Sequence, residues 1–246
     1  MSKFIDRLQK VFQPVPQSMG FKASIAEQTK PKIQLILRVV DDVSQSLPKE
    51  HNHVDAWILS EFEVRADKAV WGTWFSMGSE KEVEKSIKSG ADFVILPVSG
   101  EVLPPDKKIG KIIRIEASTT DVLLRAASEL PVDAFLLSEN EQDGLSLTWK
   151  RLMLIERFTS LLNKPLLIEV LADINETQLQ QVWEAGVSGV IVTINVTQAE
   201  AVSRNLRQII NKLSFPSKRK REKSLALIPR IERKQEEPEE DEEDDD

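Results

Sequence analysis

The sequence contains no cysteine and no tyrosine among its 246 residues. Without cysteine there are no disulfides, no thiolate nucleophile and no cysteine-ligated zinc or iron–sulfur site. Without tyrosine there is no phenol to act as an acid or base. The two histidines both lie in the stretch "EHNHV". This stretch precedes a predicted strand, so we expect both imidazoles at the end of the sheet opposite to the usual functional end.

Long apolar runs are also missing. No stretch approaches the roughly 18 residues that would cross a bilayer. The N-terminal residues "MSKFIDRLQKVFQPVPQ" carry charges where a signal peptide is apolar. We therefore expect no transmembrane segment and a cytoplasmic location.

Residues 2–12 nevertheless have the pattern of an amphipathic helix. One face of this helix carries Phe4, Ile5, Leu8, Val11 and Phe12. Such a face needs an apolar partner. We expect it to close the bottom of the fold, and peripheral membrane binding is the alternative.

The net charge of −7 is concentrated at the C-terminal end. Residues 218–234 form a basic stretch, "KRKREKSLALIPRIERK", and residues 236–246 form an acidic one, "EEPEEDEEDDD". Self-repulsion and the scarcity of apolar residues predict that 215–246 is a disordered, solvated tail. The basic run is too short to predict nucleic-acid binding.

Eight stretches rich in β-branched residues and leucine predict buried strands. They are residues 33–40, 54–60, 70–76, 91–98, 111–117, 132–138, 165–171 and 188–194. Helical patterns follow several of them, at 79–90, 119–130 and 148–163. Strands that alternate with helices favour a parallel sheet, and eight such units predict a (β/α)8 barrel with shortened early helices. A doubly wound open sheet is the alternative.

The predicted domain organisation has three parts. Residues 1–30 form the N-terminal amphipathic helix and a linker, residues 31–214 form the barrel, and residues 215–246 form the charged tail. Near the end of the barrel, Asn175 with Gln178 and Thr197 with Glu200 have the spacing of helix capping boxes. Three tryptophans, Trp57, Trp71 and Trp74, are predicted to be core residues.

The segment "WEAGVSGVIVTI" resembles the connection from the seventh helix to the eighth strand in the ribulose-phosphate-binding and aldolase-type barrel superfamily. This resemblance implies the barrel fold and chemistry related to lyases and isomerases. The chain departs from the superfamily in two respects. No lysine follows a predicted strand, which argues against a Schiff-base mechanism. The loops "LADIN" and "VTINV" lack the glycines of a phosphate site.

Charged residues lie inside three of the predicted strands. The two-residue period of a strand places Arg38, Arg114, Glu116 and Glu169 on inward faces. Buried charges must be paired, so we expect these four to converge. They form either a structural salt-bridge layer or a site in which Arg38 or Arg114 binds a substrate carboxylate and Glu116 or Glu169 acts as a catalytic general base or a metal ligand.

Three polar residues at the strand ends complete the candidate site. Asn195 follows the last strand and is a candidate substrate ligand. Asp41 and Glu61 follow the first two strands and are candidate metal ligands. Their carboxylates make a magnesium site chemically feasible, and the sequence names no other cofactor.

These patterns predict a barrel that binds a small molecule, a carboxylate or another metabolite, with reduced or lost catalysis as a further possibility. The alternative is a non-catalytic barrel that serves as a protein-interaction or scaffold module. We also expect a homo-oligomer, because the connections after the first, second and fourth strands are too poor in helix to cover the sheet.

Overall fold

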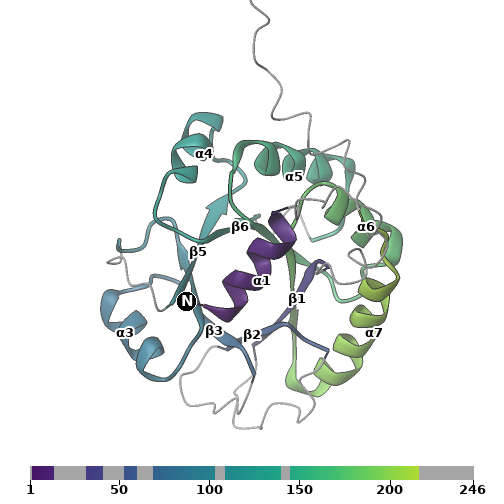
Figure 1. The fold of residues 1–246 in the computed structure, drawn as a ribbon, viewed down its shortest axis with the longest axis horizontal. Helices are drawn as coiled ribbons and strands as arrows, with labels where there is room; N and C mark the ends of the chain where they lie inside the picture. The colour runs from purple at the N-terminus through teal and green to yellow at the C-terminus, as the bar shows by residue number, and fades with distance from the viewer. Residues whose placement is uncertain are drawn as a thin grey trace, which may run out of the picture.

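The computed structural model describes residues 2–13, 32–40, 53–59, 69–102, 109–139 and 145–215. Eight parallel strands pair in chain order, and the last pairs with the first, so the sheet closes into a barrel (Figure 1). The strands are β1 (Gln34–Val39), β2 (Ala56–Leu59), β3 (Trp71–Trp74), β4 (Phe93–Pro97), β5 (Gly110–Glu116), β6 (Ala134–Ser138), β7 (Leu166–Val170) and β8 (Gly189–Ile194). The (β/α)8 prediction is confirmed, and the open sheet is wrong.

Six α-helices belong to the described residues. They are α1 (Lys3–Phe12), α3 (Glu80–Lys88), α4 (Asp121–Ser128), α5 (Trp149–Leu161), α6 (Glu176–Glu184) and α7 (Ala199–Lys212). The capping box of α6 is confirmed, since Asn175 Oδ1 accepts from the Gln178 amide at 2.9 Å. The predicted box at Thr197 is wrong. A short 3-10 turn, Val196–Gln198, precedes α7, and no side chain caps that helix.

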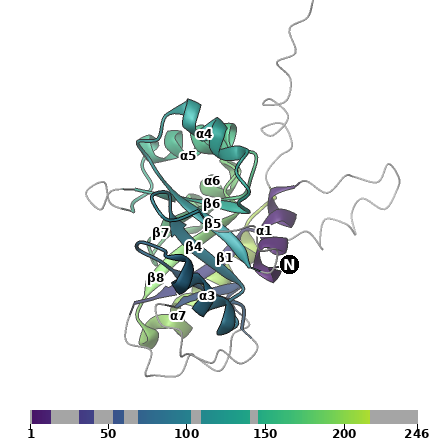
Figure 2. The same cartoon turned by 90° about the vertical axis from the view of Figure 1, so that its left-hand side faces the viewer.

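Helix α1 lies across the amino-terminal ends of the strands and fills the bottom of the barrel (Figures 1 and 2). Phe4 and Leu8 are fully buried there, and the Phe4 and Phe93 ring centroids are 4.6 Å apart. The carboxylate of Asp92 accepts from the Ser2 hydroxyl and from the backbone amides of Lys3 and Phe4 at 2.7–2.9 Å. The apolar helix face therefore packs against the barrel and is not presented to a membrane.

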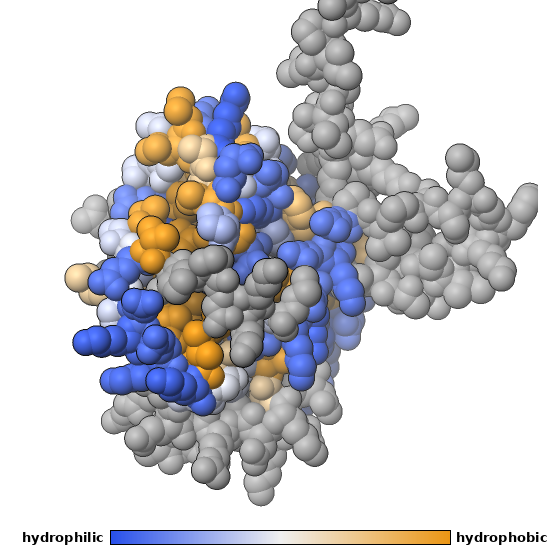
Figure 3. All heavy atoms as spheres, turned by 60° about the vertical axis from the view of Figure 1, so that its left-hand side comes forward, coloured by the Kyte–Doolittle hydropathy of each residue, from blue (hydrophilic) through white to orange (hydrophobic). Residues whose placement is uncertain are grey.

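The outer faces of the early strands are buried. Leu35, Trp57, Leu59 and Trp71 are at most 6% exposed in the single chain. The expected bare sheet is therefore not found at these residues, and self-association stays a prediction. Exposed apolar side chains gather instead on α4, where Val122 is 76% exposed (Figure 3).

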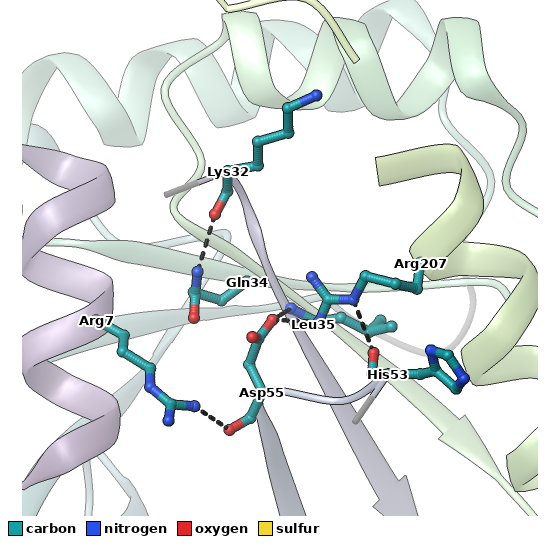
Figure 4. A network of polar contacts seen from close by, with 7 residues as sticks. All are labelled: Arg7, Lys32, Gln34, Leu35, His53, Asp55 and Arg207. Carbon is teal, nitrogen blue, oxygen red and sulfur yellow. Dashed lines mark hydrogen bonds and ion pairs between the residues drawn. The ribbon is translucent and has the colours of Figure 1, made fainter. Parts of the chain in front are cut away.

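A polar network joins α1, β1, β2 and α7 at the bottom of the barrel (Figure 4). The carboxylate of Asp55 accepts from the Leu35 amide at 2.8 Å and from Arg207 Nη2 at 2.7 Å. Arg207 also donates to the carbonyl of His53, and Arg7 donates to the carbonyl of Asp55. His53 thus lies at the amino-terminal end of the barrel, as predicted. The network has a structural role, because it ties α1 and α7 to the first two strands.

Three features fall outside the described residues: the linker at 14–31, the early connections and the tail from 216 onward. The linker and tail parts of the predicted domain organisation therefore stay predictions. Within the described chain, no helix has the length and apolarity to cross a bilayer.

Candidate functional site

Four side chains from alternate strands meet inside the carboxyl-terminal mouth of the barrel. They are Arg38 of β1, Trp74 of β3, Arg114 of β5 and Glu169 of β7, and we call them the arginine cluster. In a closed eight-stranded barrel, alternate strands contribute inward side chains at the same level. The two-residue period explains why each of the four points inward. It also explains why Trp57 and Trp71 face outward into the core while Trp74 does not.

The two guanidinium groups lie against the same indole. The Cζ of Arg38 is 4.0 Å from the centroid of the Trp74 ring, and the Cζ of Arg114 is 4.9 Å from it. Arg38 Nη1 lies 3.9 Å from Glu169 Oε2, which is an ion pair without hydrogen-bond contact. The side chains of Arg38 and Glu169 are 30% and 20% exposed. The site is thus partly open to solvent, and the indole orients its cations.

Arg114 is held more tightly than Arg38. Its Nη2 donates to the carbonyl of Phe75 at 2.9 Å. Its Nε is buried and has no hydrogen-bond partner among the described residues. Arg38, by contrast, donates no hydrogen bond to the described part of the chain, so its donors remain available.

The electrostatics of the cluster favour an added anion. Burial raises the pKa of Glu169, and the nearby Arg38 and Arg114 only partly offset that effect. Burial lowers the pKa of Arg38, and burial together with the charge of Arg38 lowers the pKa of Arg114. Two guanidinium groups face one carboxylate that is reluctant to ionise. The cluster therefore carries excess positive charge.

A second, buried ion pair contacts the backbone of Glu169. Arg151 of α5 is 5% exposed, and its Nε donates to Glu139 Oε1 at 2.8 Å. Its two Nη atoms donate to the backbone carbonyls of Glu169 and Leu145. The sequence analysis missed this pair. The available signal was the helical spacing of Arg151 with Ile155 and Phe158, which places the arginine on the buried face of α5.

Two other predicted site residues that the structure describes, Glu116 and Asn195, make no hydrogen bond or ion pair with the cluster. Glu116 has the inward alternation but is exposed at the rim, where its carboxylate accepts from the Ser118 hydroxyl at 3.1 Å. Asn195 is exposed after β8. The proposed metal ligands, Asp41 and Glu61, lie outside the described residues. Among the residues that the structure does describe, no group of three or more His, Asp or Glu side chains could hold a metal ion.

The chain matches no protein-family model and no curated protein. Solved structures do share its fold. The 3-keto-L-gulonate-6-phosphate decarboxylase from Vibrio cholerae is 12% identical with a TM-score of 0.54, and the match covers 74% of this chain and 99% of that one. A tryptophan synthase α-subunit from Pyrococcus furiosus is 12% identical with a TM-score of 0.53, and the match covers 74% and 98%.

The tryptophan synthase from M. tuberculosis extends this likeness over more of the chain. It is 12% identical with a TM-score of 0.52, and the match covers 85% of this chain and 99% of that one. At such low identity the likeness shows the fold alone. The chain is a (β/α)8 barrel, the fold that the segment "WEAGVSGVIVTI" implied.

Proposed function

We propose that this barrel binds a small organic anion whose carboxylate lies against Arg38 and Arg114 at the mouth. The observation that carries the proposal is the excess charge of the cluster. Two guanidinium groups lie against one indole, and the carboxylate beside them has a raised pKa. Such an uncompensated, partly buried charge favours a ligand of opposite sign.

The two arginines have different roles in this proposal. Arg38 donates to no described residue, and its planar guanidinium group can donate two parallel hydrogen bonds to a carboxylate. Arg114 is already bonded to the Phe75 carbonyl, so it contributes mainly charge. Trp74 fixes the orientation of both groups, which lowers the entropy lost on binding.

Glu169 gives the proposed site proton chemistry. A carboxyl group with a raised pKa can be protonated nearer neutral pH and so can donate or accept a proton there. It lies next to Arg38, where the bound carboxylate would sit. Because a shared fold does not assign a reaction, the proposal extends to binding and to the placement of this acid/base group.

The alternative function, a protein-interaction module, is favoured by one observation. Trp149 and Met153 are one turn apart on α5 and are 78% and 72% exposed. Large exposed apolar side chains in one stripe are typical of protein contacts. Failure of every small anion to bind would favour this function.

The test is an NMR titration of the tryptophan indole N–H signals with sodium acetate, with acetamide as the neutral control at constant ionic strength. We expect acetate, and not acetamide, to shift the Trp74 signal, which is assigned with a Trp74→Phe variant. The shift should disappear in Arg38→Met. It should persist in Arg157→Met, a matched control that removes an arginine paired with Asp121 on the outer surface. An acetate response that survives Arg38→Met would contradict the proposal.

A further inference from the structure

A cavity opens at the carboxyl-terminal end of the barrel, beyond the ends of β6 and β7. Its volume is about 260 Å³, and it lies between the connection from β6 to α5 and the connection from β7 to α6. Leu145, Leu171 and Ile174 supply apolar walls. Asp173, Asn175 and Gln178 supply polar groups from one side.

The capping box of α6 fixes how two of these polar groups point. Asn175 Oδ1 accepts from the Gln178 amide at 2.9 Å, and Gln178 Oε1 accepts from the Asn175 amide at 3.2 Å. Both side-chain oxygens are therefore occupied. Each side-chain NH2 group is left as a donor without a hydrogen-bond partner among the described residues, and both Asn175 and Gln178 line the cavity.

Asp173 is the charged residue among the described residues that line the cavity, so it sets the local charge. Its carboxylate has no hydrogen bond or ion pair within the described chain, and none of the described residues that line the cavity is a lysine or an arginine. A second anionic group would be repelled here. Hydroxyl groups fit, because a hydroxyl can donate to the carboxylate and accept from the amide NH2 groups.

The cavity and the arginine cluster are neighbours along β7. Leu171 follows Glu169 by two residues, which is about 6.6 Å of extended chain. Arg151 donates to the carbonyls of both Glu169 and Leu145, so one buried side chain ties the cluster to the cavity wall.

From this arrangement we infer that the cavity is the subsite for the hydroxyl-bearing chain of the ligand, which makes the ligand a polyhydroxy carboxylic acid. The inference rests on the proposed carboxylate site and adds the substrate class to it. Its carboxylate would lie on Arg38 and Arg114. Its hydroxyl groups would reach Asp173, Asn175 and Gln178.

Three probes separate the two parts of the ligand: gluconate, acetate and sorbitol. Gluconate carries both a carboxylate and a hydroxylated chain, acetate carries only the carboxylate, and sorbitol carries only the chain. For the natural sequence we expect gluconate to bind about tenfold more tightly than acetate, which is about 1.4 kcal/mol. Sorbitol should bind more weakly than gluconate. Arg38→Met should lower the affinity for both gluconate and acetate.

The double variant Asn175→Asp/Gln178→Glu is the sharpest test of the cavity. Aspartate and glutamate keep the capping box, so α6 is retained, but both NH2 donors are lost. We expect gluconate affinity to fall to the level of acetate, while acetate affinity is unchanged. Thr177→Asp adds a charge to the same helix turn outside the cavity and should leave gluconate bound.

The possible failures are distinguishable. Equal affinities for gluconate and acetate in the natural sequence would overturn the inference and leave the carboxylate site standing. A gluconate preference that survives Asn175→Asp/Gln178→Glu would also overturn it, because the chain would then lie elsewhere. If neither anion binds, or if Arg38→Met changes neither affinity, the proposed function itself fails.

Discussion

Replacing Glu169 with glutamine separates the cost of burying its carboxylate from the attraction of the two arginines. The carboxylate lies 3.9 Å from Arg38 Nη1, and its side chain is 20% exposed. At an effective dielectric constant of about 20, one ion pair at that distance gains about 4 kcal/mol. The pKa of Glu169 is nevertheless raised, so burial opposes the charged form by more than the arginines favour it.

Glutamine has the shape of the protonated carboxyl group without its ionisation. We therefore expect Glu169→Gln to be more stable than the natural sequence at pH 7. Each pKa unit between the folded and unfolded states corresponds to about 1.4 kcal/mol. For a chain of this size that is about 3–6 °C in Tm.

The raised pKa of Glu169 also determines how the stability of the protein changes with pH. A carboxyl group whose pKa is raised by folding keeps its proton longer in the folded state. Its contribution to stability is complete below the unfolded pKa of about 4.3 and is lost as pH rises through the higher folded pKa. Thermal unfolding of both proteins between pH 4 and 8 measures this. A glutamine variant that is less stable at pH 7, or a Tm difference that does not change with pH, would refute the reasoning.

Four further outcomes are expected. Leu8→Ala should cost about 3–5 kcal/mol in urea denaturation, because the side chain is fully buried between α1 and the barrel; a cost below 1 kcal/mol would show that the helix is not needed. Arg151→Met should cost about 3–5 kcal/mol, since it leaves Glu139 buried and unpaired, whereas Arg157→Met, which breaks a partly exposed pair with Asp121, should cost clearly less. Deleting 232–246 should leave Tm nearly unchanged, and a fall of several degrees would show that the acidic end packs on the barrel. Light scattering tests self-association, and a clean monomer of 27.9 kDa would reject it.

The alternation of residues in the strands was sufficient to predict which charges face inward. Arg38, Arg114 and Glu169 all follow from the two-residue period, because a one-residue error would have put each on the outer face. The same rule predicted Glu116, which is exposed at the rim. Alternation gives the face of a strand but not the depth along it. Depth depends on how far neighbouring strands are staggered, and the register of each pair is not visible in a single sequence.

The positions of long side chains were the second feature that the sequence did not predict correctly. Trp74 was predicted to be core, yet its ring lies at the mouth beneath two guanidinium groups. Arg151 was assigned only to a helix, yet its side chain reaches the carbonyl of Glu169. Neither position is set by local pattern. Each depends on tertiary partners that come from distant parts of the chain.

The lower interior of the barrel is apolar, whereas its carboxyl-terminal mouth is charged. The sequence contains a reason for this difference. Three strands carry glycines at inward positions, Gly72, Gly110 and Gly189, and a Cβ at Gly110 would lie 2.5 Å from Ile5 of α1. At Gly189 it would lie 3.2 Å from Leu8. A glycine inside a strand indicates a close approach by another part of the chain. Here Gly110 and Gly189 make room for α1, and Gly72 makes room for Phe93, whose ring packs on Phe4 of α1. The strands therefore do not need large apolar side chains at every inward position, and the upper level is free to hold Arg38, Arg114 and Glu169.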